Sequence, residues 1–139
     1  MNSRQFLPPF SELVDRMTVT QIKLNLLDEG REDFTAELMR LSNDIDIIVK
    51  EKDITLTSQL VRAIVVLSQL NLFIWQNKDE MQSNLKNEQV YLSLLKNAHQ
   101  LNGFRNQIKN RLLSIEGIQD KSQIRSNFET DGSDWNVQF

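Results

Sequence analysis

The sequence places an arginine where its helical pattern requires an apolar side chain. Between residues 94 and 115, apolar residues recur at intervals of three and four, and Arg105 occupies one of these positions. The full stripe is Leu94, Ala98, Leu101, Arg105, Ile108, Leu112 and Ile115. Such a stripe is the face that a helix buries against a core. Because an unpaired buried charge costs far more than a packed aliphatic side chain gains, the Arg105 guanidinium needs an acidic partner, a ligand or water.

Polar residues interrupt the apolar stripes of two further helical segments. Asp15 lies in line with the apolar residues that follow it, and Asn71 lies between Leu67 and Trp75. We expect these groups to converge with Arg105, since each needs a polar partner once it is buried. Neighbours on the adjoining helix faces complete the candidate ligand-binding site. Its members are Glu12, Asp15, Arg16, Lys23, Asn71, Trp75, Asp79, Asn102, Arg105 and Lys109.

One part of this site has the chemistry of an anion-binding surface. Asn102, Arg105 and Lys109 follow one another at spacings of three and four, so they form one ridge of a helix. The ridge presents an amide, a guanidinium and an ammonium, which hold a carboxylate or phosphate through charge-assisted hydrogen bonds. A bound anion fits this ridge, and Asp15 or Asp79 of the same chain fits it equally.

Acidic residues supply one pair that is similar to a metal-binding motif. Glu12 and Asp15 are three residues apart and share a helix face, as do the acidic pairs that hold Mg²⁺ in all-α nucleotide pyrophosphohydrolases. A second pair would be Asp79 and Glu80, but adjacent residues of a helix point about 100° apart. The single histidine, His99, and the lack of Cys exclude a multi-His metal site, a thiolate site and a Cys nucleophile within one chain. No metal site is predicted, and no cofactor is identified.

The candidate site requires helices to position it, and the periodicity predicts four. They cover residues 11–29, 33–52, a third segment that begins after a cap near residues 55–58 and runs to about 84, and 87–116. Ser11 stands where the first helix needs an N-cap, Thr55, Thr57 and Ser58 each offer a cap for the third helix, and Gly30 and Gly117 stand where C-terminal glycines are expected. The second helix has apolar residues at a 4-3-4-3 spacing, which is the pattern of a helix stripe or a short coiled-coil seam. They are Phe34, Leu38, Leu41, Ile45 and Ile48.

The composition fits a single helical domain. A chain of 139 residues is long enough to bury one core. Hydrophobic residues make up 40% of the chain and charged residues 25%, and the 4 Gly and 2 Pro are few enough to favour helix over turns. We predict an all-α fold, either a four-helix antiparallel bundle or paired helical hairpins. Residues 1–117 form this domain, and residues 118–139 form a flexible C-terminal tail.

Charge and hydropathy limit the classes of partner. A net charge of −3 argues against nucleic-acid binding, which draws on clustered cationic charge. The sequence has no run of 18 apolar residues, and its N-terminus lacks the apolar segment of a signal peptide. We therefore expect a cytoplasmic protein with no membrane partner.

Three segments carry the candidate residues in ordered blocks. They are SELVDRMTVTQIKL, LNLFIWQNKDEM and LNGFRNQIKNRL. These blocks resemble the Glu-x-x-Asp-Arg-(six)-Lys, Asn-(three)-Trp-(three)-Asp and Asn-x-x-Arg-(three)-Lys patterns of a family of short, uncharacterised bacterial helical proteins. That family is a domain of unknown function associated with surface-polysaccharide glycosyltransferase gene neighbourhoods. The resemblance covers about residues 11–116 and departs from the family at Lys78, where a Glu usually stands. It implies a shared polar site and names no ligand.

Three functional hypotheses fit these patterns. The first is a non-catalytic binding or accessory module whose polar pocket holds an anionic ligand, such as a phosphorylated or nucleotide-sugar-like molecule. The second is a Mg²⁺-dependent nucleotide pyrophosphohydrolase that uses Glu12, Asp15 and Asp79. The third is a structural interaction protein in which the polar cluster sets helix register. We also expect a homodimer, because the seam of the second helix and two large hairpins offer more apolar surface than one small bundle hides.

Overall fold

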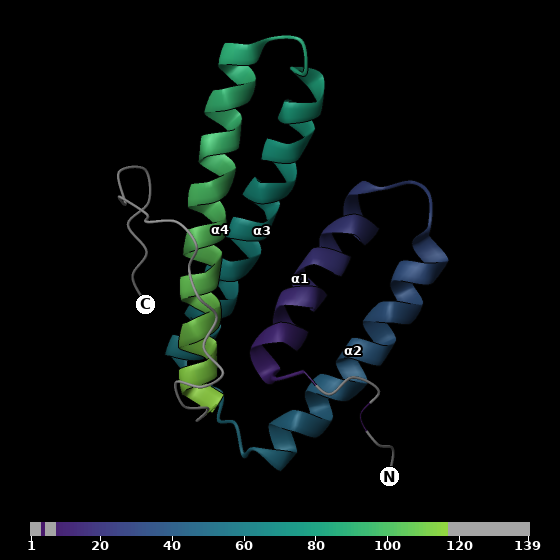
Figure 1. Cartoon of the computed structure of the whole chain (residues 1–139). Coiled ribbons are helices and arrows are strands. Elements are labelled where there is room, and N and C mark those ends of the chain that lie inside the picture. The colour runs from purple at the N-terminus through teal and green to yellow at the C-terminus, as the bar shows by residue number, and fades with distance from the viewer. Residues whose placement is uncertain (1–3, 5–7, 117–139) are drawn as a thin grey trace.

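The computed structural model describes Arg4 and residues 8–116, and its regular structure is entirely helical. The four helices are α1 (Phe10–Leu26), α2 (Arg31–Glu51), α3 (Ser58–Ser83) and α4 (Glu88–Glu116). They form two helical hairpins, α1–α2 and α3–α4, which pack against each other (Figure 1). The predicted all-α class is confirmed, in the form of paired hairpins.

Helix α1 is the central element of the fold. It packs against α2, α3 and α4, whereas α2 packs mainly against α1 (Figure 1). The fully buried core residues come from both hairpins and include Leu13 on α1, Leu67 and Leu70 on α3, and Ile108 and Leu112 on α4. A polar group on the inner face of α1 therefore lies against the other hairpin.

The first hairpin begins and turns differently from the prediction. Pro9 is the N-cap of α1, and Ser11 is a buried residue of the first turn rather than the cap. Helix α1 ends at Leu26 because Leu27 is extended. Gly30 does not close α1: it has φ +78° and is the N-cap of α2, which begins two residues earlier than predicted. The predicted roles of Ser11 and Gly30 were wrong, although the left-handed φ explains why a glycine stands there.

The end of α1 is capped by the first residue of α2. The Arg31 guanidinium donates hydrogen bonds to the carbonyl oxygens of Leu24 and Leu27. Carbonyl groups in the last turn of a helix have no helical donor, so a side chain from the next element can satisfy them. Because this cap comes from the next helix, the residues of α1 alone did not predict that the helix ends at Leu26.

The end of α3 and both ends of α4 agree with the prediction within one residue, and α3 begins at one of its three candidate caps. Thr57 is the N-cap of α3, and its hydroxyl accepts a hydrogen bond from the backbone N–H of Leu60 at 3.2 Å. At the start of α4, the side-chain oxygen of Asn87 accepts one from the N–H of Val90 at 3.3 Å. The predicted closing residue Gly117 and the tail 118–139 lie outside the described residues.

The apolar seam predicted on α2 is used within the chain. Leu41 and Ile48 are buried, and Ile45 packs against the core. Because α2 packs mainly on α1, these residues form the contact within the first hairpin. The seam is therefore largely covered.

Helix α3 has more apolar surface than the fold buries. Among the described helices it is the one that is long and apolar enough to cross a membrane, by length and composition only. One third (33%) of its most apolar 18-residue window is buried inside the chain. Core helices of soluble proteins also pass this test, but they are mostly buried. Helix α3 differs from them in the smaller buried share of its apolar window.

Candidate functional site

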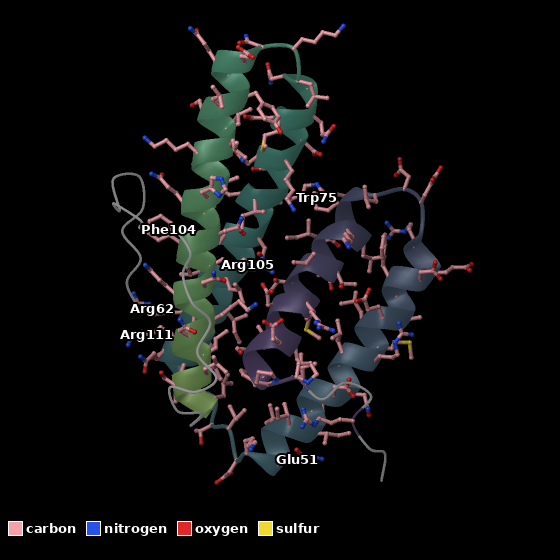
Figure 2. The ribbon with its side chains drawn as sticks, viewed as in Figure 1. Glu51, Arg62, Trp75, Phe104, Arg105 and Arg111 are labelled. Carbon is pink, nitrogen blue, oxygen red and sulfur yellow. The ribbon has the colours of Figure 1, made fainter. Side chains whose placement is uncertain are left out.

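A buried carboxylate, Asp15, is the centre of the polar site. It lies on the inner face of α1 and is 2% exposed. Arg105 reaches it from α4 with both sides of its guanidinium fork: Nε donates to Oδ1 at 3.0 Å, and Nη2 donates to Oδ2. Figure 2 shows Arg105 on the part of α4 that lies beside α1. The inward arginine of the sequence thus pairs with Asp15.

A second cation, Lys109, lies one turn further along α4. Its side chain is 8% exposed, and its Nζ forms an ion pair with Glu12 of α1. The same Nζ lies 3.4 Å from Oδ2 of Asp15. Glu12 and Asp15, which are one turn apart on α1, therefore match Arg105 and Lys109, which are one turn apart on α4.

Helix α3 adds an amide to the same carboxylate. The side-chain N–H₂ of Asn71 donates to Oδ1 of Asp15 at 2.9 Å and to the hydroxyl of Thr18 at 2.6 Å. The Thr18 hydroxyl in turn donates to the backbone carbonyl of Asp15 at 2.8 Å. Asp15 is thus bound by α3 and α4 at once. We name the six residues Glu12, Asp15, Thr18, Asn71, Arg105 and Lys109 the Asp15 cluster.

The ionised form of Asp15 is favoured by this cluster. Burial by itself would raise the pKa of the carboxyl group, because desolvation penalises the charged form. The hydrogen bonds and charge of Arg105, the hydrogen bond of Asn71 and the charge of Lys109 outweigh the burial and hold the pKa below its ordinary value of 3.8. At neutral pH the cluster contains two carboxylates and two cations, so its formal charges cancel.

Five of the ten residues predicted for the site lie in the cluster, and five do not. Arg16 and Asp79 are exposed. Lys23 has its Nζ 6.0 Å from the centroid of the Phe34 ring on α2, at the other side of α1. Trp75 and Asn102 are half-buried, and among the described residues neither makes one of the hydrogen bonds of the cluster. Of the predicted ridge of Asn102, Arg105 and Lys109, the two cations therefore belong to the Asp15 cluster and Asn102 does not.

Thr18 of the Asp15 cluster and Asn77 of α3 make hydrogen bonds between helices that were not predicted from the sequence. Thr18 follows Asp15 by three residues and so shares its face, which was the available signal. Asn77 of α3 is 5% exposed; it donates to the backbone carbonyl of Leu94 at 2.9 Å and accepts from Asn97 at 2.9 Å. Both of these partners lie on α4. This second polar contact joins α3 to α4 near their shared turn, away from α1.

The acidic groups are arranged for ion pairing within the chain. Glu12 and Asp15 are engaged by Lys109 and Arg105, and Asp79 is exposed on α3. Among residues 8–116 and Arg4, no group of three His, Asp or Glu side chains lies where it could hold a metal ion. The arrangement gives the pyrophosphohydrolase hypothesis no supporting contact.

The fold and site define an all-α protein of two packed hairpins joined by a buried ionic cluster. No family model, curated protein or solved structure matches the chain.

Proposed function

We propose that this protein is a non-catalytic helical interaction module in which the Asp15 cluster sets the register of α1 on the α3–α4 hairpin. The observation that supports it is the mutual pairing of the charged groups: Arg105 and Lys109 are both bound to carboxylates of the same chain. Catalytic sites commonly hold a titratable group whose pKa is shifted toward the working pH. In Asp15 the pKa is shifted in the opposite direction, which favours the ionised form.

The geometry of the cluster suits a role in register. A bidentate arginine–carboxylate pair has one preferred geometry, unlike apolar contacts, which tolerate sliding. Moving α1 by one helical turn, about 5.4 Å, would separate Asp15 from Arg105 and Asn71 together. The alternative position would leave buried charges unpaired, so the cluster disfavours it strongly.

The test is to replace the ionic pair by apolar side chains and measure the helix positions. In the double variant Asp15→Leu/Arg105→Met we expect a free energy of unfolding within about 1 kcal/mol of wild type or higher, because buried ion pairs often contribute little net stability. The distance between nitroxide labels at the exposed positions Asn25 on α1 and Lys96 on α4 should nevertheless broaden. The chain has no Cys, so labels introduced through Cys substitutions attach only there.

The matched control removes an ion pair of the same type that lies away from the cluster, with the Arg4 side chain 16% exposed. Arg4 and Glu51 lie 3.6 Å apart, and the Glu51 side chain is 47% exposed. The variant Arg4→Met/Glu51→Leu should leave the spin-label distance narrow. A narrow distance distribution in the Asp15→Leu/Arg105→Met variant would show that apolar packing alone sets the register.

A second candidate function is anion binding at the solvent-facing edge of the cluster. The observation that favours it is the Arg105 side chain, which is 29% exposed although it is bound to Asp15. On this proposal, inorganic phosphate or uridine diphosphate glucose raises the unfolding temperature of wild type by a few degrees and leaves that of Arg105→Met unchanged. Equal responses from the two proteins would count against it.

A further inference from the structure

The outer side of α3 carries an apolar strip that Arg4 and residues 8–116 leave exposed. Val61, Val65, Leu72 and Phe73 each expose between 37% and 49% of their surface. At 100° per residue, Val61, Val65, Ser68 and Leu72 lie within a sector of about 60°, and each lies about 140–180° from the buried residue Leu70. We name Val61, Val65, Ser68 and Leu72 the outer face of α3.

The spacing of the outer face matches a helix as its partner. Val61, Val65, Ser68 and Leu72 follow a 4-3-4 pattern, which is that of a two-helix seam. The strip is narrow: on one side it borders Gln69 and Gln76, both exposed, and on the other side it borders the half-buried Ile64 and Trp75. A narrow line of side chains at this spacing fits one helix better than a broad surface.

The polar residues along the outer face favour a protein partner over a lipid bilayer. Ser68 lies in the middle of the strip, and its hydroxyl already donates to the backbone carbonyl of Val65 at 2.8 Å. It can therefore be covered by another helix without losing a hydrogen bond, and its small size permits close approach. The amides of Gln69 and Gln76 would be unsatisfied in hydrocarbon but can form hydrogen bonds across a protein interface.

The charges along α3 identify the partner. Arg62 lies near the N-terminus of α3 (Figure 2), and near its C-terminus the exposed residues Lys78, Asp79 and Glu80 together carry a net charge of −1. An antiparallel second copy of α3 would place the acidic end of each helix beside the basic end of the other, and also beside its N-terminus, where negative charge is favourable. A parallel arrangement would place like charges together at both ends. The outer face is thus self-complementary about a two-fold axis.

We propose that the protein forms an antiparallel homodimer through the outer face of α3. With the two-fold axis between Ser68 and Gln69, Val65 of each copy packs against Leu72 of the other. This inference deepens the proposed function, since it names a second copy of the chain as the partner of the interaction module. The register role of the cluster is measured within one chain, so a monomeric protein would overturn the dimer and leave that proposal standing.

Mass and concentration test the interface. Light scattering and sedimentation of the full chain should give twice its mass of 16.2 kDa. Val65→Lys, which introduces a charge at an exposed position without affecting the core, should weaken the dimer at least about a hundredfold and leave the helical circular dichroism unchanged. Met39→Lys on α2 is the matched control, because Met39 is also exposed (70%) and lies on another surface. Its dimer should have the affinity of wild type. A wild-type monomer at all concentrations, or equal dissociation by both lysines, would overturn the proposal.

Cross-linking tests the antiparallel orientation. The Ser68→Cys variant lies near the axis, so a short bismaleimide should join its two copies. In the Val61→Cys variant the two thiols would be about 22 Å apart along the helices and should not be joined. Efficient cross-linking of Val61→Cys would show a parallel pair and overturn the orientation. If wild type instead binds phosphatidylcholine–phosphatidylglycerol vesicles and Val65→Lys abolishes this, the occupant is a membrane and the dimer proposal fails.

Discussion

Asp15→Asn should lower the free energy of unfolding by about 3 kcal/mol at neutral pH, although it changes a single atom of the side chain. Removing one partner of a buried ion pair costs about 3–5 kcal/mol because the remaining charge is left without compensation. Asp15 is bound by Arg105 and lies near Lys109, so its loss leaves the cluster with two cations and one carboxylate. We expect the lower part of the range, since Arg105 is partly exposed and Lys109 keeps Glu12. Urea unfolding followed by circular dichroism measures the change.

The effect of Asp15→Asn should depend on pH in a definite direction. Because the pKa of Asp15 is lowered in the folded protein, this group contributes its full stability above the unfolded value near 3.8 and loses it as pH falls through the lower folded pKa. The difference between wild type and variant should therefore be constant near neutral pH and shrink in acid. Glu51→Gln, at an ion pair whose carboxylate is 47% exposed, should cost less than about 0.5 kcal/mol. An Asp15→Asn effect as small as that of Glu51→Gln would contradict the structural role of the cluster.

The sequence predicted the centre of the site because a buried charge restricts its own surroundings. Arg105 in an apolar stripe demands an acid, and Asp15 was the acid that stood in a comparable position on another helix. The choice between Asp15 and Asp79 could not be made from periodicity. It depends on where α1 crosses the second hairpin, and that is set by packing among three helices. Asp79 lies two turns beyond Asn71, on the outer side of α3.

The polar residues that were not predicted, Thr18 and Asn77, are uncharged, so burying them does not require a charged partner. Asn77 continues the stripe that α3 actually buries, whose members are Leu60, Ala63, Leu67, Leu70 and Ile74. The predicted stripe instead followed Leu67, Asn71 and Trp75, so it was rotated by part of a turn. Trp75 is half-buried, and its size made it a stronger apolar signal than Ala63. The predicted end of α1 was wrong because its last carbonyl groups are capped by Arg31, a residue of the next helix.

Helix α3 connects the two proposals about this protein. Asn71 and Leu72 are neighbours in sequence, yet Asn71 binds Asp15 on the inner side of α3 and Leu72 is exposed on its outer side. The inner contact fixes α3 relative to α1, and the outer face is proposed to contact a second copy. A change in the cluster would therefore reposition α1 more than the dimer interface. In a dimer held by α3, the two α1–α2 hairpins are the parts whose placement depends on Asp15.

Leu13→Ala should destabilise the protein by between about 2 and about 5 kcal/mol, with no dependence on the charge of the cluster. Leu13 is fully buried on α1, the helix that packs against all three others, and a Leu→Ala change there loses transfer energy and leaves a cavity. Leu26→Ala is the matched control on the same helix, since Leu26 is 53% exposed and should change stability by no more than about 0.5 kcal/mol. Urea unfolding at neutral and at acidic pH separates the two contributions of α1. The loss from Leu13→Ala should persist in acid, where that from Asp15→Asn shrinks. If both losses shrank together, α1 would be detached from the second hairpin in acid, and the core of α1 would depend on the ionic cluster for its position.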